Sequence, residues 1–397
     1  MNTASDRPGQ PVVTAPVVTA PVSPGAVTVR VARTVDELDA AVWDSLCGPD
    51  DYFTAAYLQA LTRSEMDCLF RFLLAEADGA AVGLGFGYTF SPRLPGPLKI
   101  RIFSTGTPTD IGFPFVVRAG VPPVPVLDAL IGAAIDQAGD GKASAIVVRD
   151  VLDPGQPQGC ETVLDAHRLR GFPLFAEALL PITWATFEDY LASLRRGYRQ
   201  EIRRMARQVE QAGFKFEVVS GAEAAGLAAE LQPLWMEVFN RHPEDWDQLV
   251  LPEAYFREVL ALPGSVLLLL RHEGRVVAFD NLRENGSVLD SKFCGRDYGR
   301  IGRLPVGHFL IAETIRHACE NGFALLSFGI TNEQVKSRYG CVFRVIRGYR
   351  RPISAPLRLA RVLRLEPFLV RGYDVDAALA DIAEGHVFRK PDSPASR

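Results

Sequence analysis

The sequence predicts a mixed α/β (α+β) fold in which one domain pattern occurs twice, each copy having a mixed central sheet flanked by helices. The length of 397 residues suits two domains of ordinary size. Hydrophobic residues make up 48% of the chain and charged residues 23%, which is typical of a globular protein. The apolar periodicity of both halves gives the same order of elements, β-α-α-β-β-β-α-β-α-β, so we expect a tandem duplication.

The first copy is expected at residues 27–183. Residues 1–26 precede it and repeat Pro-Val-Val-Thr-Ala at 11–15 and 16–20, a composition typical of a disordered leader. Apolar alternation predicts strands at 27–33, 68–77, 81–90, 98–104, 143–148 and 174–182. Helical periodicity predicts one helix that begins in a capping box of Thr34 and Glu37, and others at 52–61, 124–137 and 161–169.

A basic helix is expected to link the two copies across residues 184–213. Its apolar positions recur every three or four residues from 187 to 211. The same helix carries six arginines, which are Arg195, Arg196, Arg199, Arg203, Arg204 and Arg207. They are interpreted either as a solvated face or as a surface for the phosphates of CoA, a nucleotide-linked substrate or tRNA, because like charges four residues apart destabilise a helix.

The second copy is expected at residues 214–352. Its predicted strands are 214–219, 265–271, 275–283, 287–294, 323–328 and 342–349, and its predicted helices are 222–239, 252–260, 305–320 and 331–339. Residues 353–397 are expected to form a C-terminal helix and tail.

A loop rich in glycine and arginine precedes the predicted helix at 305–320. Its candidate ligand-binding residues are Arg296, Arg300, Gly302, Arg303, Pro305 and Gly307. The free N–H groups of a glycine-rich loop, the positive end of the helix dipole and the arginines together favour a pyrophosphate site. The alternative is an ordinary strand-to-helix loop with surface arginines.

Four sequence segments carry a family resemblance. They are LRRGYR at 194–199, LPVGHFL at 304–310, LLSFG at 325–329 and KSRYG at 336–340. Together they resemble the second domain of FemAB-type acyltransferases, a group of peptidoglycan-bridge aminoacyltransferases and acetyltransferase-like proteins within the GNAT superfamily. The resemblance covers about residues 185–350, whereas the first half is similar in element order only.

The resemblance implies a tandem GNAT N-acyltransferase whose donor, acyl-CoA such as acetyl-CoA, would lie on the second domain. The acceptor would be an amine of a small molecule or of a cell-wall (peptidoglycan) precursor, bound between the domains. An alternative donor is aminoacyl-tRNA, and an alternative from another class is a non-catalytic binding protein with a degenerate GNAT domain. The family usually has an acidic residue where this chain has Ser327, which leaves the acceptor contacts open.

Acyl transfer to an amine requires a proton acceptor and a group that stabilises the tetrahedral oxyanion. Asp290 is the first candidate for the proton acceptor, and Lys336 is the candidate for oxyanion stabilisation or for a donor phosphate. Tyr339 is a candidate proton donor to the leaving group, with a core position as the alternative. Candidate substrate contacts are Asp280, which is also a second candidate base, Lys292 and Trp235, whose cluster with Phe239, Trp246 and Tyr255 is equally explained by core packing.

The remaining composition restricts the class of protein. The formal net charge of −4 provides no overall basic field for nucleic acid. The six cysteines and six histidines have no metal-ligand spacing, so we expect reduced thiols and no metal. No signal-peptide pattern is present and the longest apolar run, 266–270, is too short to span a membrane, so we expect a cytoplasmic protein. Its expected assembly is a monomer or a homodimer.

Overall fold

The computed structural model describes residues 26–48, 52–92, 100–152, 156–241, 249–362, 374–380, 382 and 386–389. The repeated pentapeptide at 11–20 and Trp246 lie outside these residues. Within them the protein has the predicted mixed α/β architecture, and both halves follow the predicted order of elements apart from short additional elements and predicted helices that are divided in two. The fold class predicted from the sequence is therefore confirmed.

The first half follows the predicted pattern with one addition, the short strand β5. Its strands are β1 (Thr28–Ala32), β2 (Leu69–Ala77), β3 (Ala80–Phe90), β4 (Ile102–Thr105), β5 (Phe115–Val117), β6 (Ala145–Val151) and β7 (Arg170–Pro181). Its helices are η1 (Val35–Glu37), α1 (Ala40–Asp44), α2 (Ala55–Arg63), α3 (Pro123–Asp140) and α4 (Cys160–Ala166). The Asp78-Gly79 turn between β2 and β3 has positive φ at both residues, as a tight hairpin requires.

The second half begins after the linking segment. Its strands are β8 (Lys215–Ser220), β9 (Ser265–His272), β10 (Arg275–Asn285), β11 (Val288–Arg296), β12 (Leu325–Ser327) and β13 (Val342–Pro352). Its helices are α7 (Gly221–Gly226), α8 (Ala228–Phe239), α9 (Glu253–Leu260), α10 (Tyr298–Ile301), α11 (Val306–Glu320) and α12 (Glu333–Ser337). The chain then forms α13 (Ala355–Val362) and α15 (Val375–Leu379).

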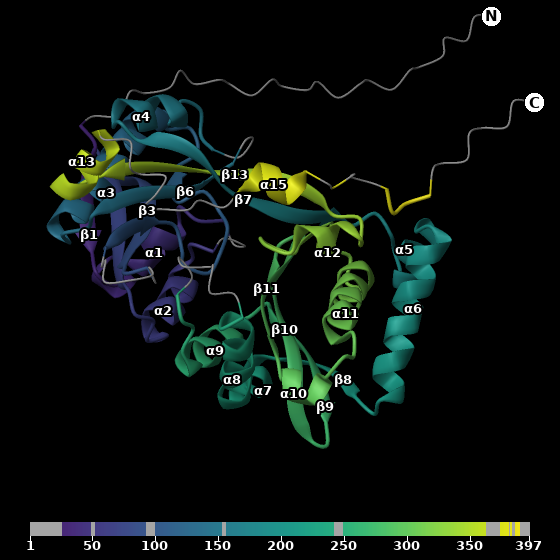
Figure 1. Ribbon diagram of the computed structural model, residues 1–397. Helices are drawn as coiled ribbons and strands as arrows, with labels where there is room; N and C mark the ends of the chain where they lie inside the picture. The colour runs from purple at the N-terminus through teal and green to yellow at the C-terminus, as the bar shows by residue number, and fades with distance from the viewer. Residues whose placement is uncertain are drawn as a thin grey trace, which may run out of the picture.

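The two halves share one continuous sheet because they exchange their last strands. The strand order is β1-β2-β3-β4-β6-β13-β7-β12-β11-β10-β9-β8, with β5 beside β3. Strand β13, from the end of the second half, pairs with β6 of the first half, and β7, from the end of the first half, pairs with β12 of the second. In Figure 1 these two exchanged strands run side by side between the two halves.

Each half covers its part of the sheet with helices on both faces. In the second half α8 and α9 lie on one face and α11, backed by α6 (Arg196–Gln211), lies on the other (Figure 1). Alternate residues of β9 therefore enter different cores: Leu267 and Leu269 pack with α8 and α9, and Leu268 packs with α11. Helices α1 and α2 of the first half join the α8–α9 core, so the halves also share apolar packing.

The predicted linking helix is interrupted. Helix α5 (Phe187–Ser193) ends before Leu194, and α6 begins at Arg196. Leu194 and Arg195 have extended backbone angles, and Leu194 forms a β-bridge with Phe388 near the C-terminus. Helical periodicity continues across the interruption, and only this long-range pairing shows why the helix breaks there.

Candidate functional site

The site forms where two neighbouring strands of the second half part. Strands β11 and β12 are parallel partners from Val288 with Leu325 to Asp290 with Ser327. Beyond this point β12 ends, whereas β11 continues to Arg296. The segment that follows β12 instead bonds to the exchanged strand, because Phe328 N donates to Ala178 O at 2.9 Å. Backbone groups of β11 are thus released from pairing with β12 beside the polar residues described below.

Lys336 lies buried next to this strand separation. It comes from α12, and its Nζ donates to the backbone oxygens of Ile330 at 2.6 Å and Gly329 at 3.3 Å. Burial lowers the pKa of Lys336 to about 8, although the nearby groups Cys341, Glu333, Cys294 and Asp280 raise it. An ammonium with such a pKa changes charge close to physiological pH.

Asp280 lies in the same electrostatic neighbourhood as Lys336, on β10. Its carboxylate accepts hydrogen bonds from Ser291 Oγ at 2.9 Å and from Thr314 Oγ1 at 2.9 Å. Burial raises the pKa of Asp280 to about 6, and its hydrogen bonds together with Arg296 and Lys336 limit the rise. The structure therefore places the predicted residues Asp280, Lys336 and Arg296 near one another.

Arg296 ends β11 and lies against the first turn of α11. A Cβ atom on Gly307 would lie 2.6 Å from Arg296 Cζ, so only glycine allows this close approach. The Arg296 Nε atom is buried and has no hydrogen-bond partner among the described residues. Helix α11 begins after Pro305, and no side chain of the described residues caps its start, so the N–H groups of its first turn donate no hydrogen bond to a capping side chain. Cationic and N–H donors thus converge at this helix end, as an anion requires.

The other loop residues occupy different environments. Arg300 is exposed and pairs with Asp297 at 3.2 Å and with Glu273 at 3.6 Å. Gly302 has a φ of 54°, so the turn that follows α10 favours glycine. Arg303 is exposed on the surface, two residues before Pro305. Of the predicted loop arginines, Arg296 is the one in contact with Gly307 at the start of α11.

A bulge in β11 carries Lys292 to the boundary between the halves. Asn281 pairs with Phe293 and Leu282 with Ser291, which leaves Lys292 as the extra residue. Its Nζ lies 2.6 Å from Asp110 Oδ1 of the first half and 4.4 Å from the centre of the Tyr52 ring.

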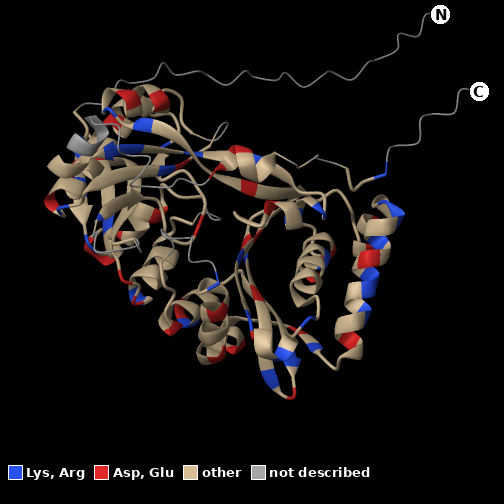
Figure 2. Ribbon diagram, in the orientation of Figure 1, with Lys and Arg blue, Asp and Glu red and all other residues tan. Residues whose placement is uncertain are grey.

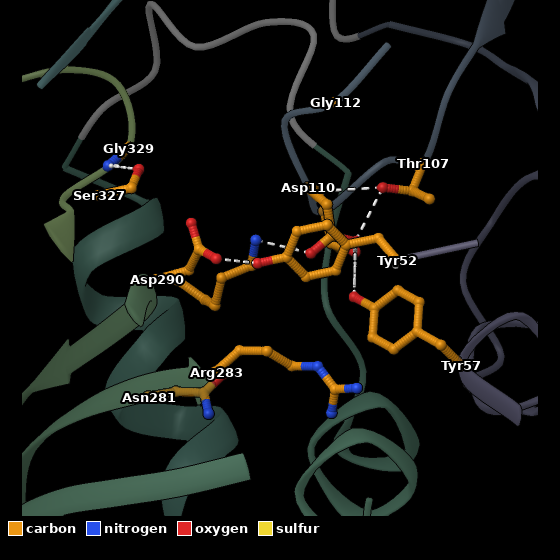
Figure 3. A network of polar contacts seen from close by, with 12 residues as sticks. Tyr52, Tyr57, Thr107, Asp110, Gly112, Asn281, Arg283, Asp290, Ser327 and Gly329 are labelled. Atoms are coloured by element: carbon orange, nitrogen blue, oxygen red, sulfur yellow. Dashed lines mark hydrogen bonds and ion pairs between the residues drawn. The ribbon is translucent and has the colours of Figure 1, made fainter. Parts of the chain in front are cut away.

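Asp290 completes this cluster from the same strand. Figure 3 shows Tyr52 of the first half pointing toward Asp290, and the Tyr52 hydroxyl donates a hydrogen bond to Asp290 Oδ2. Burial raises the pKa of Asp290, whereas Lys292 and the Tyr52 hydrogen bond lower it. The structure thus brings together Asp290 and Lys292, which the sequence predicts, with Tyr52 and Asp110, for which the sequence suggests no specific role.

Asp110 is held by three hydroxyl groups of its own half. Its Oδ2 atom accepts from Tyr57 at 2.6 Å, Thr107 at 2.8 Å and Thr109 at 3.0 Å. Burial alone would raise the pKa of Asp110, but Lys292 and these donors hold it below the usual value. The hydroxyl-rich TxTD pattern at 107–110 is the sequence signal that could have identified this carboxylate site.

Glu177 is a second buried carboxylate that sequence reasoning missed. It lies on the exchanged strand β7, and its Oε1 accepts from Ser327 Oγ at 2.8 Å. Its Oε2 accepts from Arg344 Nη2 at 2.6 Å. A carboxylate is therefore present beside Ser327, supplied by the neighbouring strand. Because Glu177 is 150 positions from Ser327, no local pattern could have shown the pair.

Two predicted residues lie within the apolar cores. Trp235 is 2% exposed, stacks on Phe239 with ring centres 4.7 Å apart and packs edge-on against Phe293. Tyr339 is also 2% exposed, and its hydroxyl lies 2.9 Å from His308 Nδ1. Burial raises the pKa of Tyr339 above its usual range, so its hydroxyl stays protonated at neutral pH.

The arginines of α6 form a charged surface on the outer side of the second half. Figure 2 shows basic residues along this helix. Arg203 pairs with Glu188, and Arg195 donates to Phe388 O at 3.1 Å. In the part of the chain that the structure describes, no ion pair is found for the other four, which are Arg196, Arg199, Arg204 and Arg207.

The corresponding strand of the first half is interrupted. Strand β3 pairs with β4 over 87–90 and with β5 over 83–85, and residues 106–114 leave the sheet between them. This excursion carries Thr107, Thr109 and Asp110, and Gly112 N approaches Asp150 Oδ2 at 3.5 Å. The first half therefore lacks a continuous counterpart of β11, the strand that positions Lys292 and Arg296 in the second half.

Two further properties concern the described residues only. Among them, no group of three His, Cys, Asp or Glu side chains could hold a metal ion. None of the helices that the structure describes has both the length and the apolar character needed to cross a membrane.

Comparison with known proteins concerns the domain type and the fold. Residues 196–337 match the family model described as the acetyltransferase (GNAT) domain. The crystal structure of FemX is similar over 84% of this chain and 99% of that one, with 16% identity and a TM-score of 0.53. Putative 8-amino-7-oxononanoate synthase 2, from two strains of Mycobacterium tuberculosis, is 25% identical over 258 residues and 63% of this chain. The chain spans about a third (33%) of the length of these curated relatives.

The matched GNAT domain contains the strand separation, α11 and Lys336. The FemX similarity extends across both halves and shows the shared tandem fold. The predicted GNAT resemblance is thus matched by a GNAT domain model over residues 196–337, and the chain as a whole has a tandem fold similar to that of FemX.

Proposed function

We propose that this protein is an N-acyltransferase that moves an acyl group from acyl-CoA to an amine. The proposal is carried by the position of Arg296, which lies against Gly307 at the uncapped start of α11. The Nε atom of Arg296 is buried and has no hydrogen-bond partner among the described residues. A pyrophosphate would supply that acceptor and also neutralise the positive helix end. Arg300, Gly302, Arg303 and Pro305 would border the same anion.

The acyl thioester would extend from this anion site along β11 to the strand separation. There the N–H groups of β11 beyond Asp290 are free of pairing with β12. Lys336 is proposed to stabilise the oxyanion that forms when the amine attacks the thioester carbonyl. A positive group placed in a water-poor site gives strong transition-state stabilisation.

The proton steps require two further groups. Asp290 is proposed to accept the proton from the attacking amine, since its pKa is raised by burial and it lies at the boundary between the halves. Collapse of the tetrahedral intermediate breaks the carbon–sulfur bond, and the departing thiolate takes a proton. Tyr339, whose hydroxyl lies 2.9 Å from His308 Nδ1, is the proposed donor.

The acceptor is proposed to be an amine of a small molecule or of a cell-wall precursor, bound near Asp290 and Lys292. Asp280 and Trp235 would act from behind the strand separation, where they support the backbone that contacts substrate. We place the reaction in the cytoplasm, where acyl-CoA is available.

The direct test is calorimetric titration of the full chain with CoA and acetyl-CoA. Arg296→Ala and Gly307→Ala are expected to weaken binding about 10-fold or more, because a charge-assisted contact to phosphate is lost or displaced. Gly197→Ala is the matched control, since it lies on helix α6 with no atom within 4 Å of the added Cβ. Absence of CoA binding to the unaltered protein at millimolar concentration would refute the acyl-CoA proposal.

A second candidate donor is aminoacyl-tRNA, favoured by the four arginines of α6 without an ion pair among the described residues. Arginines at this spacing could contact consecutive backbone phosphates. In that case affinity for charged tRNA would fall steeply with added salt, and neutralising Arg199 and Arg207 would reduce the slope by about one unit per contact. A salt-independent affinity would exclude this donor.

A further inference from the structure

The exchanged strand β7 delivers a carboxylate of the first half into the second half. Glu177 is 4% exposed and accepts hydrogen bonds at both oxygens, from Ser327 and from Arg344. Arg344 contributes two N–H groups to Oε2, from Nε at 3.1 Å and Nη2 at 2.6 Å. A buried carboxylate bonded on both sides has one orientation, and it fixes the partner that donates to it.

The partner Ser327 begins a tight turn at the end of β12. Gly329 N donates to Ser327 Oγ at 3.2 Å, and Gly329 has a φ of 63°, in the left-handed region that favours glycine. Ala178, next to Glu177, holds the same turn through its backbone, because Ala178 N donates to Gly329 O at 2.9 Å. Two consecutive residues of β7 therefore hold the turn: Glu177 bonds to Ser327 at its start, and Ala178 bonds to Gly329 two residues later.

Lys336 bonds to the far side of this turn. The carbonyl of Gly329 that accepts from Ala178 also accepts from Lys336 Nζ, and Ile330 O accepts from the same ammonium. A continuous chain of hydrogen bonds thus runs from Arg344 through Glu177, Ser327 and Gly329 to Lys336. Glu177 does not need to touch substrate to influence the ammonium, because it sets the position of the oxygens that the ammonium contacts.

We propose that Glu177 is a positioning residue for acyl transfer, which holds Lys336 in place through Ser327 and the 327–330 turn. The proposal rests on the function proposed above for Lys336. It means that the geometry of the second-half site depends on a residue of the first half. The exchange of β7 and β13 makes that dependence possible.

The test uses the full chain with acetyl-CoA and an amine acceptor that the unaltered protein acylates. Glu177→Gln keeps the shape but loses the charge that holds Arg344, and Ser327→Ala removes the connecting hydroxyl without burying a charge. Both are expected to lower kcat about 10- to 100-fold with little change in the donor KM, because small displacements of a catalytic group have effects of this size. The double variant should be no worse than the stronger single variant, since both changes break one network.

The pH profile separates positioning from a merely structural role. If the turn moves, its carbonyls stabilise the charged form of Lys336 less, so the loss of kcat at high pH should begin at lower pH in Glu177→Gln. A merely structural role would reduce the yield of folded enzyme and leave the profile in place. Glu188→Gln is the matched control, because Glu188 is an exposed carboxylate that pairs with Arg203.

Two results would overturn the proposal while leaving the function intact. One is wild-type kcat and pH profile in both Glu177→Gln and Ser327→Ala. The other is an effect of Glu177→Gln that persists in full when Lys336 is already replaced by alanine. If the unaltered protein binds no acyl donor and acylates no amine, the proposed function fails instead.

Discussion

Lys292 and Asp110 form a buried ion pair of 2.6 Å between Nζ and Oδ1, and each lies where the fourth strand of its own half is irregular or ends. Lys292 is the extra residue of the β11 bulge, and Asp110 lies in the excursion that separates β4 from β5. The Lys292 side chain is 9% exposed and the Asp110 side chain 2%. The duplicated halves are therefore joined where their equivalent strands depart from regular pairing.

Removing one member of this pair should destabilise the protein strongly. Asp110→Asn removes the ion-pair partner of the buried Lys292 ammonium, for which a loss of about 3–5 kcal/mol in the free energy of unfolding is expected. Urea denaturation at pH 7 measures it. The double variant Asp110→Asn, Lys292→Met should recover part of the loss, and equal losses in the single and double variants would contradict a coupled pair.

The same pair predicts acid sensitivity. The pKa of Asp110 is lower in the folded protein than its usual value of about 3.9. Below that value the unfolded chain binds the proton more readily, so the contribution of Asp110 to stability is present at neutral pH and is lost as the pH falls through the folded-state pKa. Asp110→Asn should remove this part of the acid dependence.

Tyr52→Phe should shift the low-pH side of the activity profile. The Tyr52 hydroxyl donates to Asp290 and thereby lowers its pKa, against the rise caused by burial. Without this donor the pKa of Asp290 rises further, so a reaction that requires the carboxylate loses activity at higher pH than in the unaltered protein. Initial rates measured from about pH 4, the usual carboxyl pKa, to about pH 8 give the shift. Tyr198→Phe, on the half-buried side of α6, is the control and should leave the profile unchanged.

Lys336 should set the high-pH side of the profile. Its pKa is lowered by burial to about 8, so the ammonium needed for oxyanion stabilisation is lost as the pH rises through that value. Lys336→Arg keeps a positive charge at all accessible pH values. We expect this variant to have a lower maximum rate. Its rate should not decline near pH 8, where the pKa of about 8 makes the unaltered Lys336 lose its charge. A decline that stays at the same pH would mean that another group causes it.

Gly295→Ala tests the packing of α8 behind the site. A Cβ atom on Gly295 would lie 2.7 Å from Trp235 N and 2.8 Å from Leu234 C, both backbone atoms of α8. Because a helix backbone cannot yield as a side chain does, the free energy of unfolding should fall by about 1–3 kcal/mol. Gly226→Ala is the control, since nothing lies within 4 Å of its added Cβ and the change should cost nothing.

Part of the candidate site can be predicted from the sequence because some of its signals are local. The glycine and arginine pattern before α11 predicts an anion site, and Arg296 with Gly307 provides such an arrangement at the helix start. Asp290, Lys292 and Lys336 are likewise predicted, and they lie around the strand separation of the second half. Their catalytic roles remain predictions, which the variants above test.

Other contacts of the site depend on residues far apart in the chain. Tyr52 and Asp290 are 238 positions apart, and Glu177 and Ser327 are 150 apart. Alternation within a strand shows which residues share a face, but it does not show which strand lies beside it. The predicted helix at 187–211 fails at Leu194 for a similar reason, because its β-bridge to Phe388 is formed by the other end of the chain.

The sequence by itself determined the order of elements, their duplication and the polar loop before α11, because periodicity, turn residues and helix ends are encoded over a few neighbouring positions. Only the tertiary structure decided that β7 and β13 exchange places, since every sheet edge offers the same backbone hydrogen bonds. That exchange places Glu177 beside Ser327 in the second half. Which strands pair depends on how well the side chains of the whole sheet are buried at once, and a single short segment of sequence does not contain that information.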